Sequence, residues 1–303
     1  MKHVFGPIPS RRLGRSLGIG MVPLKTCNWS CVFCQLGRTE VLSNTRGNHA
    51  PAGEILAEVR EVLAGPLGSQ IEALLYAPAV REALLPADAV LPSLNADSET
   101  PHRRIQRPHA SLTFERHLQG LVDFRRQYAG NLWVEVMLVR GLNDTEEALW
   151  DLAAALDHVQ PDEVHELLPT RLTAEPWVSC PDPDALTRAQ TILGSVDPVR
   201  GPASSLENHS EDLASAVLGI VSRHPMTERE LVVYDRSWTL QEVLKVPAEL
   251  QARGKLRLID SGGKAFWAAR ACRYGSEVGT DEPTRPGRPG PPGPLDGREE
   301  GSP

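Results

Sequence analysis

The chain has 303 residues, of which 41% are hydrophobic and 23% are charged, and its net charge is −7. This composition is typical of a globular protein and excludes a disordered or fibrous one, while the length suggests two domains. The sequence contains no apolar run of about 18 residues, so we expect no membrane-spanning helix. The N-terminus lacks the apolar core of a secretory signal, which predicts a cytoplasmic protein.

The first two-thirds of the chain alternates between predicted strands and helices. The strands are predicted at Leu17–Val22, Ile71–Tyr76, Ala89–Leu94, Leu132–Val139 and Glu163–Leu168. Apolar residues at helical spacing predict helices at Ala52–Leu63, at Ala79–Leu85, from near Thr113 to Gly130, from the capping-box-like pair Asp144 and Glu147 to Leu156, and at Asp184–Leu193. This alternation indicates βαβ units and a mostly parallel sheet or barrel, with functional groups at the carboxyl ends of the strands.

The last third of the chain has a different pattern. We expect helices at Glu211–Ser222 and Thr239–Arg253, with the second kinked or split at Pro247, and then a hairpin of Lys255–Asp260 and Lys264–Ala268. Helices followed by a two-stranded wing predict a small winged-helix-like domain. Its nearly balanced charge favours a structural or partner-docking role over nucleic-acid binding. The predicted units are a barrel at 1–193, a linker at 194–210, the small domain at 211–272 and a disordered Gly/Pro-rich tail at 273–303.

The N-terminal segment is basic although the whole chain is acidic. Seven cations stand against one carboxylate, Glu40, in the first 46 residues: Lys2, Arg11, Arg12, Arg15, Lys25, Arg38 and Arg46. A local excess of this kind predicts a local anionic partner, and scattered solvated arginines are the alternative interpretation.

Three of the five cysteines lie close together after the first predicted strand. Cys27, Cys31 and Cys34 form a C-x3-C-x2-C pattern with Phe33 just before the last thiol. An odd number of cysteines in a chain without a secretory signal argues for metal or redox chemistry and against a disulfide framework. Structural zinc takes four ligands, whereas a [4Fe–4S] cluster held by three cysteines leaves one iron open. The spacing therefore favours an iron–sulfur site over zinc and over buried structural cysteines.

This loop resembles the cluster loop of radical S-adenosylmethionine (SAM) enzymes. The run Phe5–Ile19 resembles the start of a bacterial and archaeal subgroup of these Fe–S oxidoreductases, which is broadly related to the wyosine-synthesis radical enzymes. Further matches to that subgroup are Cys34–Gly37, Leu91–Leu94, Arg107–His109, Glu135–Val139 and Glu175–Trp177. The resemblance covers about residues 4–193.

The resemblance implies an α/β fold with a partial (β/α)6 TIM-like barrel. It also implies that Cys27, Cys31 and Cys34 ligate a [4Fe–4S] cluster whose open iron chelates SAM. One-electron reduction, by a protein such as flavodoxin or ferredoxin, would cleave SAM to methionine and a 5′-deoxyadenosyl radical that abstracts hydrogen from a substrate. The cofactor-binding residues implied by the resemblance are Phe33, Ser93, Asn95, Glu135 and Asn143. Packing in a strand and in a turn are the alternative roles of Ser93 and Asn143.

The sequence also departs from the family pattern. It lacks the second-strand Gly-Glu-Pro motif that binds the methionine amino group in these enzymes, and its Glu-Pro dipeptides are Glu175-Pro176 and Glu282-Pro283. Residues 64–88 have room for one short strand where the family has two, so the barrel is predicted to be shortened by about one βαβ unit. Glu166 stands in the last strand, where the family prefers an uncharged residue.

Three hypotheses for function remain open. The first is a radical SAM enzyme, and the second is a degenerate or non-catalytic iron–sulfur or zinc-binding module that docks a partner or nucleic acid. Modification of tRNA is a weaker third. The substrate is not identified, but Arg103, Arg104 and Arg107 are candidates for binding a phosphate or carboxylate, with a solvated basic loop as the alternative.

Overall fold

The computed structural model describes residues 4–10, 14–19, 23–45, 54, 57–58, 81–82, 84–196, 213–234 and 239–275. The predicted strand Ile71–Tyr76, most of the helix Ala52–Leu63, nearly all of the linker and the tail beyond Gly275 lie outside these residues. Within the described ranges, no helix is both long enough and apolar enough to cross a membrane.

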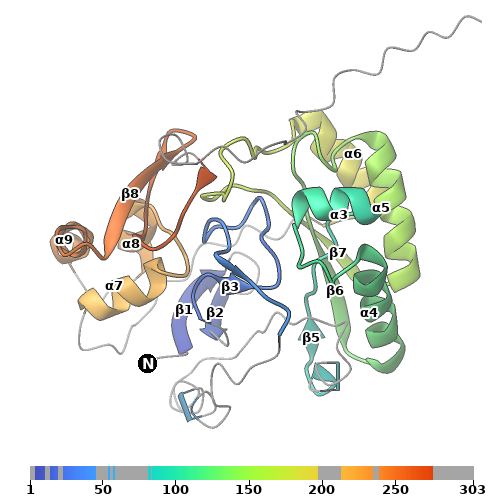
Figure 1. Ribbon diagram of the computed structural model, residues 1–303, viewed down its shortest axis with the longest axis horizontal. Helices are drawn as coiled ribbons and strands as arrows, with labels where there is room; N and C mark the ends of the chain where they lie inside the picture. The colour runs from blue at the N-terminus through green and yellow to red at the C-terminus, as the bar shows by residue number, and fades with distance from the viewer. Residues whose placement is uncertain are drawn as a thin grey trace, which may run out of the picture.

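A parallel sheet forms the centre of the larger part of this mixed α/β fold. Strand β6 (Asn131–Met137) lies between β5 (Ala89–Val90) and β7 (Glu163–Leu167), with Val134 beside Val164 in the register. The helices of this part are α3 (Glu99–Ile105), α4 (Phe114–Gln127), α5 (Glu146–Val159) and α6 (Pro183–Leu193). Figure 1 shows α4, α5 and α6 on one side of the sheet and the N-terminal segment on the other.

The core lies between this sheet and its helices because each contributes one apolar face. Val134 and Val136 of β6, Phe124 of α4 and Leu149 and Leu152 of α5 are fully buried in one cluster. Burial of each such side chain contributes about 1.5–3 kcal/mol relative to exposure. The packed sheet therefore fixes the positions of the residues at its carboxyl edge.

Polar side chains cap the N-termini of α4, α5 and α6, with one difference from the sequence prediction. Thr145, and not Asp144, caps α5: its side chain accepts a hydrogen bond from the backbone N–H of Ala148. Asp144 instead accepts from the N–H of Gly141 at 2.7 Å and closes the turn after β6. Both residues have the side chain of an N-cap, so composition alone did not separate them.

The N-terminal strands differ from the prediction. Strand β2 (Gly14–Ile19) pairs antiparallel with β1 (Val4–Ser10), and so the predicted strand Leu17–Val22 does not join the parallel sheet over its described residues. The strand that leads into the cysteines is β3 (Thr26–Cys27), which pairs in parallel with β4 (Val41–Leu42). A short apolar run specifies a strand but not its partner, and pairing with β1, which ends only four residues before β2 begins, costs little chain entropy.

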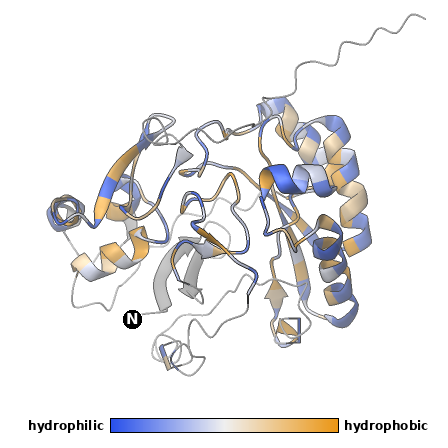
Figure 2. Ribbon diagram, in the orientation of Figure 1, coloured by the Kyte–Doolittle hydropathy of each residue, from blue (hydrophilic) through white to orange (hydrophobic). Residues whose placement is uncertain are grey.

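The C-terminal part has three helices and a hairpin. They are α7 (Leu213–Val221), α8 (Glu228–Tyr234), α9 (Leu240–Ala252), β8 (Leu256–Ser261) and β9 (Lys264–Ala269). The predicted antiparallel hairpin is confirmed, whereas α8 was not predicted. Helix α9 is not split, because it continues through Pro247. In Figure 2, α7 is mostly hydrophobic, in keeping with the separate core that Val217 and Ile220 form with Leu250 and Trp267. Helix α4 is mostly hydrophilic and buries only one face.

Candidate functional site

The cysteine loop, residues 27–38, is held by backbone hydrogen bonds to distant segments. The N–H of Val32 donates to the carbonyl of Ile105 at 2.9 Å, and the N–H of Ser30 donates to that of Gln106 at 3.0 Å, so the loop joins the end of α3. On its other side, the N–H of Glu175 donates to the carbonyl of Val32 at 3.1 Å. Val32 is fully buried against Val139, which follows β6. These contacts place the loop beside the carboxyl edge of the parallel sheet.

None of the three cysteines of the loop forms a disulfide, and neither do Cys180 and Cys272. Cys27 is exposed, whereas Cys31 and Cys34 are half-buried. Burial raises the pKa of the Cys34 thiol, and a backbone hydrogen bond from Leu36 opposes this shift. The N–H of Trp29 lies 3.4 Å from the sulfur of Cys27 and donates to it. N–H donors of this kind stabilise a thiolate, the form that binds metal.

The donor set of the loop is suited to an iron–sulfur cluster. Soft thiolate ligands select Fe–S clusters, zinc or copper(I) over magnesium and calcium. Among the residues that the structure describes, no three His, Cys, Asp or Glu side chains are close enough together to hold a metal ion, so the thiols share a loop without converging. The fit to a cluster therefore rests on the kind of ligand and on the spacing.

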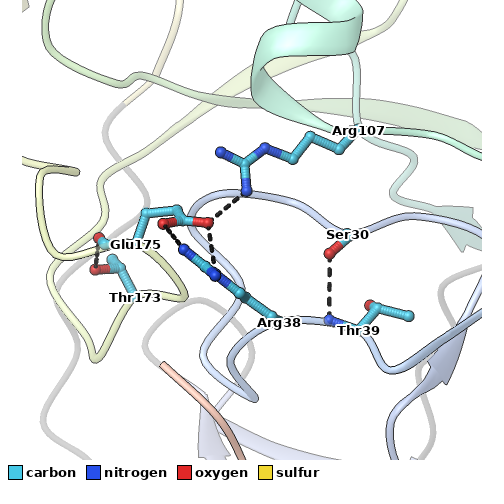
Figure 3. Close-up of polar contacts among 6 residues, drawn as sticks. All are labelled: Ser30, Arg38, Thr39, Arg107, Thr173 and Glu175. Atoms are coloured by element: carbon cyan, nitrogen blue, oxygen red, sulfur yellow. Dashed lines mark hydrogen bonds and ion pairs between the residues drawn. The ribbon is translucent and has the colours of Figure 1, made fainter. Parts of the chain in front are cut away.

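Glu175 forms an ion pair with two arginines beside the loop (Figure 3). Arg38 of the loop donates from Nε and Nη2 to the two carboxylate oxygens, at 3.0 and 2.9 Å, and Arg107 donates from Nη1 to Oε1. Only 4% of the Glu175 side chain is exposed. Burial alone would raise its pKa, but the hydrogen bonds from both arginines outweigh burial and hold the pKa below its usual value. The ionised carboxylate thus links the loop, the end of α3 and the segment 173–178.

The segment that follows β9 packs on the same loop. The hydroxyl of Tyr274 donates to the carbonyl of Gln35 at 2.8 Å, the N–H of Arg38 donates to the carbonyl of Arg273 at 2.8 Å, and the N–H of Gly275 donates to the carbonyl of Ala174 at 2.7 Å. Residues 273–275 were predicted to begin a disordered tail, yet they form ordered contacts here. We call residues 272–275 the strap.

A cluster of buried rings lies under the loop. The indole of Trp29 meets the imidazoles of His102 and His117 edge-on, with ring centroids 6.3 and 5.3 Å apart. Burial lowers the pKa of His117 to about 4 and also lowers that of His102. Nε2 of His117 is hydrogen-bonded to the carbonyl of Ser93 at 2.9 Å. Both imidazoles are therefore neutral at pH 7 and serve to position Trp29.

Most of the predicted cofactor-binding residues lie at the ends of β5 and β6. Ser93 pairs with Glu135 in a parallel bridge, and the side-chain oxygen of Asn95 accepts from the N–H of Met137 at 2.8 Å. The side-chain amide of Asn143 donates to the carbonyls of Asn95 and Met137, at 2.9 and 3.0 Å. These bonds fasten the two strand ends together. The contact of these residues with a cofactor stays a prediction.

Phe33 connects the cysteine loop to this edge. It packs with Val32 and Val139 in a small apolar cluster that also contacts Met137 and Leu142. The loop therefore lies beside the strand ends that carry the predicted cofactor-binding residues.

Two of the seven cations of the basic segment, Lys25 and Arg38, have described side chains and act within the chain. Nζ of Lys25 donates to the carbonyl of Leu36 at 2.7 Å, and Arg38 pairs with Glu175. Arg38 is thus engaged by a carboxylate of the same chain, and an anionic partner for the basic segment stays a prediction. Glu175 stands out in the sequence only within a family match and a Glu-Pro dipeptide, because no local pattern indicates that it meets the loop.

Several curated proteins are similar in sequence to this chain, although no protein-family model matches it. GTPase Obg of Brachyspira hyodysenteriae is 34% identical over 57% of this chain, and this chain spans about a third of that protein, 31% of its length. A UPF0026 protein of Methanocaldococcus jannaschii is 27% identical over 88% of this chain and 96% of its own length. A UPF0026 protein of Synechocystis sp. is 31% identical over 55% of this chain and 76% of its own length.

Solved structures show weaker likenesses. A domain of pyruvate-formate lyase-activating enzyme from Bacteroides vulgatus has a TM-score of 0.36 at 12% identity and covers 47% of this chain and 84% of its own. A radical SAM methyltransferase from Sphaerobacter thermophilus has a TM-score of 0.40 at 16% identity and covers 67% of this chain and 69% of its own. TM-scores this low establish no shared fold.

Proposed function

This chain belongs to the UPF0026 family, and we propose that it is a radical SAM enzyme in which Cys27, Cys31 and Cys34 hold a [4Fe–4S] cluster. The observation that carries the proposal is the loop of three reduced cysteines at C-x3-C-x2-C spacing, packed beside the carboxyl edge of parallel strands. This edge is where open α/β sheets bind their ligands. Three cysteines would leave one iron for the amino and carboxylate groups of SAM.

The residues of this chain would hold and shield the cluster. When bound, the cluster and SAM would together supply a 5′-deoxyadenosyl radical for abstraction of hydrogen from a substrate. Burial of Val32 and its backbone hydrogen bond to Ile105 fix the middle of the loop, and the N–H of Trp29 stabilises the Cys27 thiolate. Phe33 lies on the side of the loop that faces the strand ends, where an adenine would stack.

The remaining parts of the proposal concern the setting of this site. We place Ser93, Asn95, Glu135 and Asn143 beside the cofactor, with the two asparagines acting through the strand ends they fasten. The scaffold would be a partial (β/α)6 barrel shortened by about one βαβ unit, and the C-terminal part would be winged-helix-like. A cytoplasmic one-electron donor such as flavodoxin or ferredoxin would reduce the cluster.

Anaerobic reconstitution of the full chain with iron and sulfide tests the proposal. We expect about four irons and four sulfides per chain, a paramagnetic signal after reduction, and 5′-deoxyadenosine when SAM is added. Cys27→Ser, Cys31→Ser and Cys34→Ser should each abolish both cluster and product. Cys180→Ser is the matched control, because Cys180 is also half-buried and outside any disulfide but does not belong to the loop. Cluster formation without cleavage of SAM would overturn the catalytic part.

A non-catalytic metal-binding module is the second candidate, and one observation favours it. The sequence lacks the Gly-Glu-Pro motif, and Glu175, the Glu-Pro glutamate that lies beside the loop, is engaged by Arg38 and Arg107. It is therefore not free to receive the ammonium group of methionine. One tightly bound zinc per chain with no acid-labile sulfide would establish this candidate in place of the first.

GTP hydrolysis, which the name of one relative states for that relative, is not proposed for this chain. The sequence contains no G-x4-G-K-[ST] phosphate-binding loop.

A further inference from the structure

We propose that Arg107 binds a carboxylate or phosphate group of the substrate. This inference rests on the proposed function, whose substrate it assigns to the class of oxyanions. Arg107 lies directly after α3, and its carbonyl accepts from the N–H of Ser30 at 3.3 Å, so it is tied to the cysteine loop. A group bound here would lie beside the loop.

The guanidinium of Arg107 is held by one nitrogen and leaves the other two for a ligand. Nη1 donates to Glu175, and within the described part of the chain no acceptor is bonded to Nε or Nη2. Figure 3 shows these two nitrogens turned away from the Glu175 carboxylate. Nε and Nη2 form the side-on pair with which arginine binds both oxygens of a carboxylate or phosphate.

The backbone of Arg107 is as constrained as its side chain. Its φ of +45° lies in the left-handed region, which side chains other than glycine rarely adopt. Pro108 follows it, and the loop and the end of α3 hold it on the other side. A guanidinium fixed in this way loses little conformational freedom when it binds an anion.

The charge of the cluster also favours an anion. Glu175 carries one negative charge against the two positive charges of Arg38 and Arg107, and Arg38 alone already donates to both carboxylate oxygens. The second arginine is therefore not needed to satisfy Glu175. The Glu175 side chain is 4% exposed, whereas that of Arg107 is 36% exposed, so the excess positive charge faces solvent.

The neighbouring arginines lack this arrangement. Arg103 is paired with Glu99 on the surface of α3 at 2.5 Å, and Arg104 is exposed on the same helix. Of the three arginines that the sequence suggested for anion binding, the structure orients Arg107. Arg104 supplies the matched control.

The test is protection from phenylglyoxal, an arginine reagent, mapped by mass spectrometry on the full chain with inorganic phosphate or acetate as the probe. We expect either anion to slow modification of Arg107 at least severalfold and to leave Arg104 unchanged. Equilibrium dialysis with labelled phosphate should show about a tenfold loss of affinity in Arg107→Lys and no loss in Arg104→Lys. Arg107→Lys keeps the charge that faces Glu175 but lacks the side-on pair of nitrogens.

The same labelling on the cluster-loaded chain identifies the source of the anion. SAM should leave Arg107 open to phenylglyoxal, because the open iron takes the methionine carboxylate. Protection of Arg107 by SAM, with phosphate no longer competing, would assign the subsite to the cofactor and overturn the proposal. Equal protection of Arg104 and Arg107, or none, would also overturn it. A chain that loads no cluster but shows phosphate-protected Arg107 would refute the proposed enzyme and support the anion subsite alone.

Discussion

Replacing Glu175 with glutamine removes the charge that holds two arginines beside the cysteine loop. The variant keeps the shape of the side chain and the backbone N–H that donates to Val32, so the change is confined to the ion pairs with Arg38 and Arg107. The glutamine oxygen can accept from one guanidinium, but its NH2 group then faces the other. Two cations remain together with no carboxylate between them.

The expected loss of stability is about 2 kcal/mol. Removing one partner of a fully buried ion pair costs about 3–5 kcal/mol, and we take less than this because both arginines are about a third exposed to water. For a protein of this size, about 2 kcal/mol corresponds to a fall in Tm of about 4–8 °C. The pKa of Glu175 is lowered on folding, so its ion pairs stabilise the folded chain fully above the ordinary pKa of 4.5. The stabilisation is lost as the pH falls through the folded-state pKa.

Thermal unfolding of the metal-free chain, followed by circular dichroism from pH 7 down to pH 4 and below, measures both effects. Glu175→Gln should melt several degrees below the wild type at pH 7, and the two curves should converge on acidification. Glu249→Gln is the control, because the pair of Glu249 with Lys245 is exposed on α9 and should contribute less than about 1 kcal/mol. An unchanged Tm at pH 7, or a difference that persists unchanged at low pH, would refute the reasoning.

Three further predictions concern how the loop is held. Gly37→Ala should lower Tm more than Gly263→Ala does, as measured by scanning calorimetry. The two glycines have similar φ values, +75° and +74°, but a Cβ at Gly37 would overlap the strap, whereas nothing lies within 4 Å of a Cβ at Gly263. Tyr274→Phe should cost about 1 kcal/mol and speed amide exchange in the loop, since the half-buried carbonyl of Gln35 loses its donor. Unchanged exchange would argue against the strap. Burial lowers the pKa of His117 from 6.5 to about 4, so this residue should leave wild-type stability full above pH 6.5. Between pH 6.5 and pH 4 the free energy of unfolding should fall by up to about 1.4 kcal/mol per pH unit. His117→Phe should flatten this fall when thermal unfolding is measured across the same pH range.

The strands of the central sheet and helices α4, α5 and α6 could be predicted from the sequence because their patterns are local, whereas the short helix α3 was not predicted. Leu132–Val139 is an apolar run, interrupted only by Glu135, and β6 (Asn131–Met137) covers most of it with β7 beside it. The hairpin at 256–269 was predicted for the same reason, since two short strands flank Gly262 and Gly263. The first strand was wrong in its partner, because period and length do not say whether a short strand pairs with a hairpin neighbour or with a distant parallel strand.

The candidate site could be predicted only as far as its own loop. The spacing of Cys27, Cys31 and Cys34 identifies them in the sequence, and Phe33 is identified by its position just before Cys34. The residues that fix this loop come from elsewhere in the chain: Ile105 ends a helix, Glu175 lies in an irregular segment, and Tyr274 begins what composition predicts to be a tail. None has a periodic pattern, because each acts through one long-range contact.

These long-range contacts bear on the division of the chain into domains. The predicted small domain ends at 272, and the strap that continues from it donates to the carbonyl of Gln35, beside Cys34, and accepts from the N–H of Arg38. The three thiols of the loop do not converge. The conformation of the loop therefore depends on the segments that pack against it. Removal of the residues beyond 210 should therefore weaken retention of the cluster even if the central sheet still folds. The cysteine spacing supplies the ligands, and the C-terminal part helps to set the conformation in which they would meet a cluster.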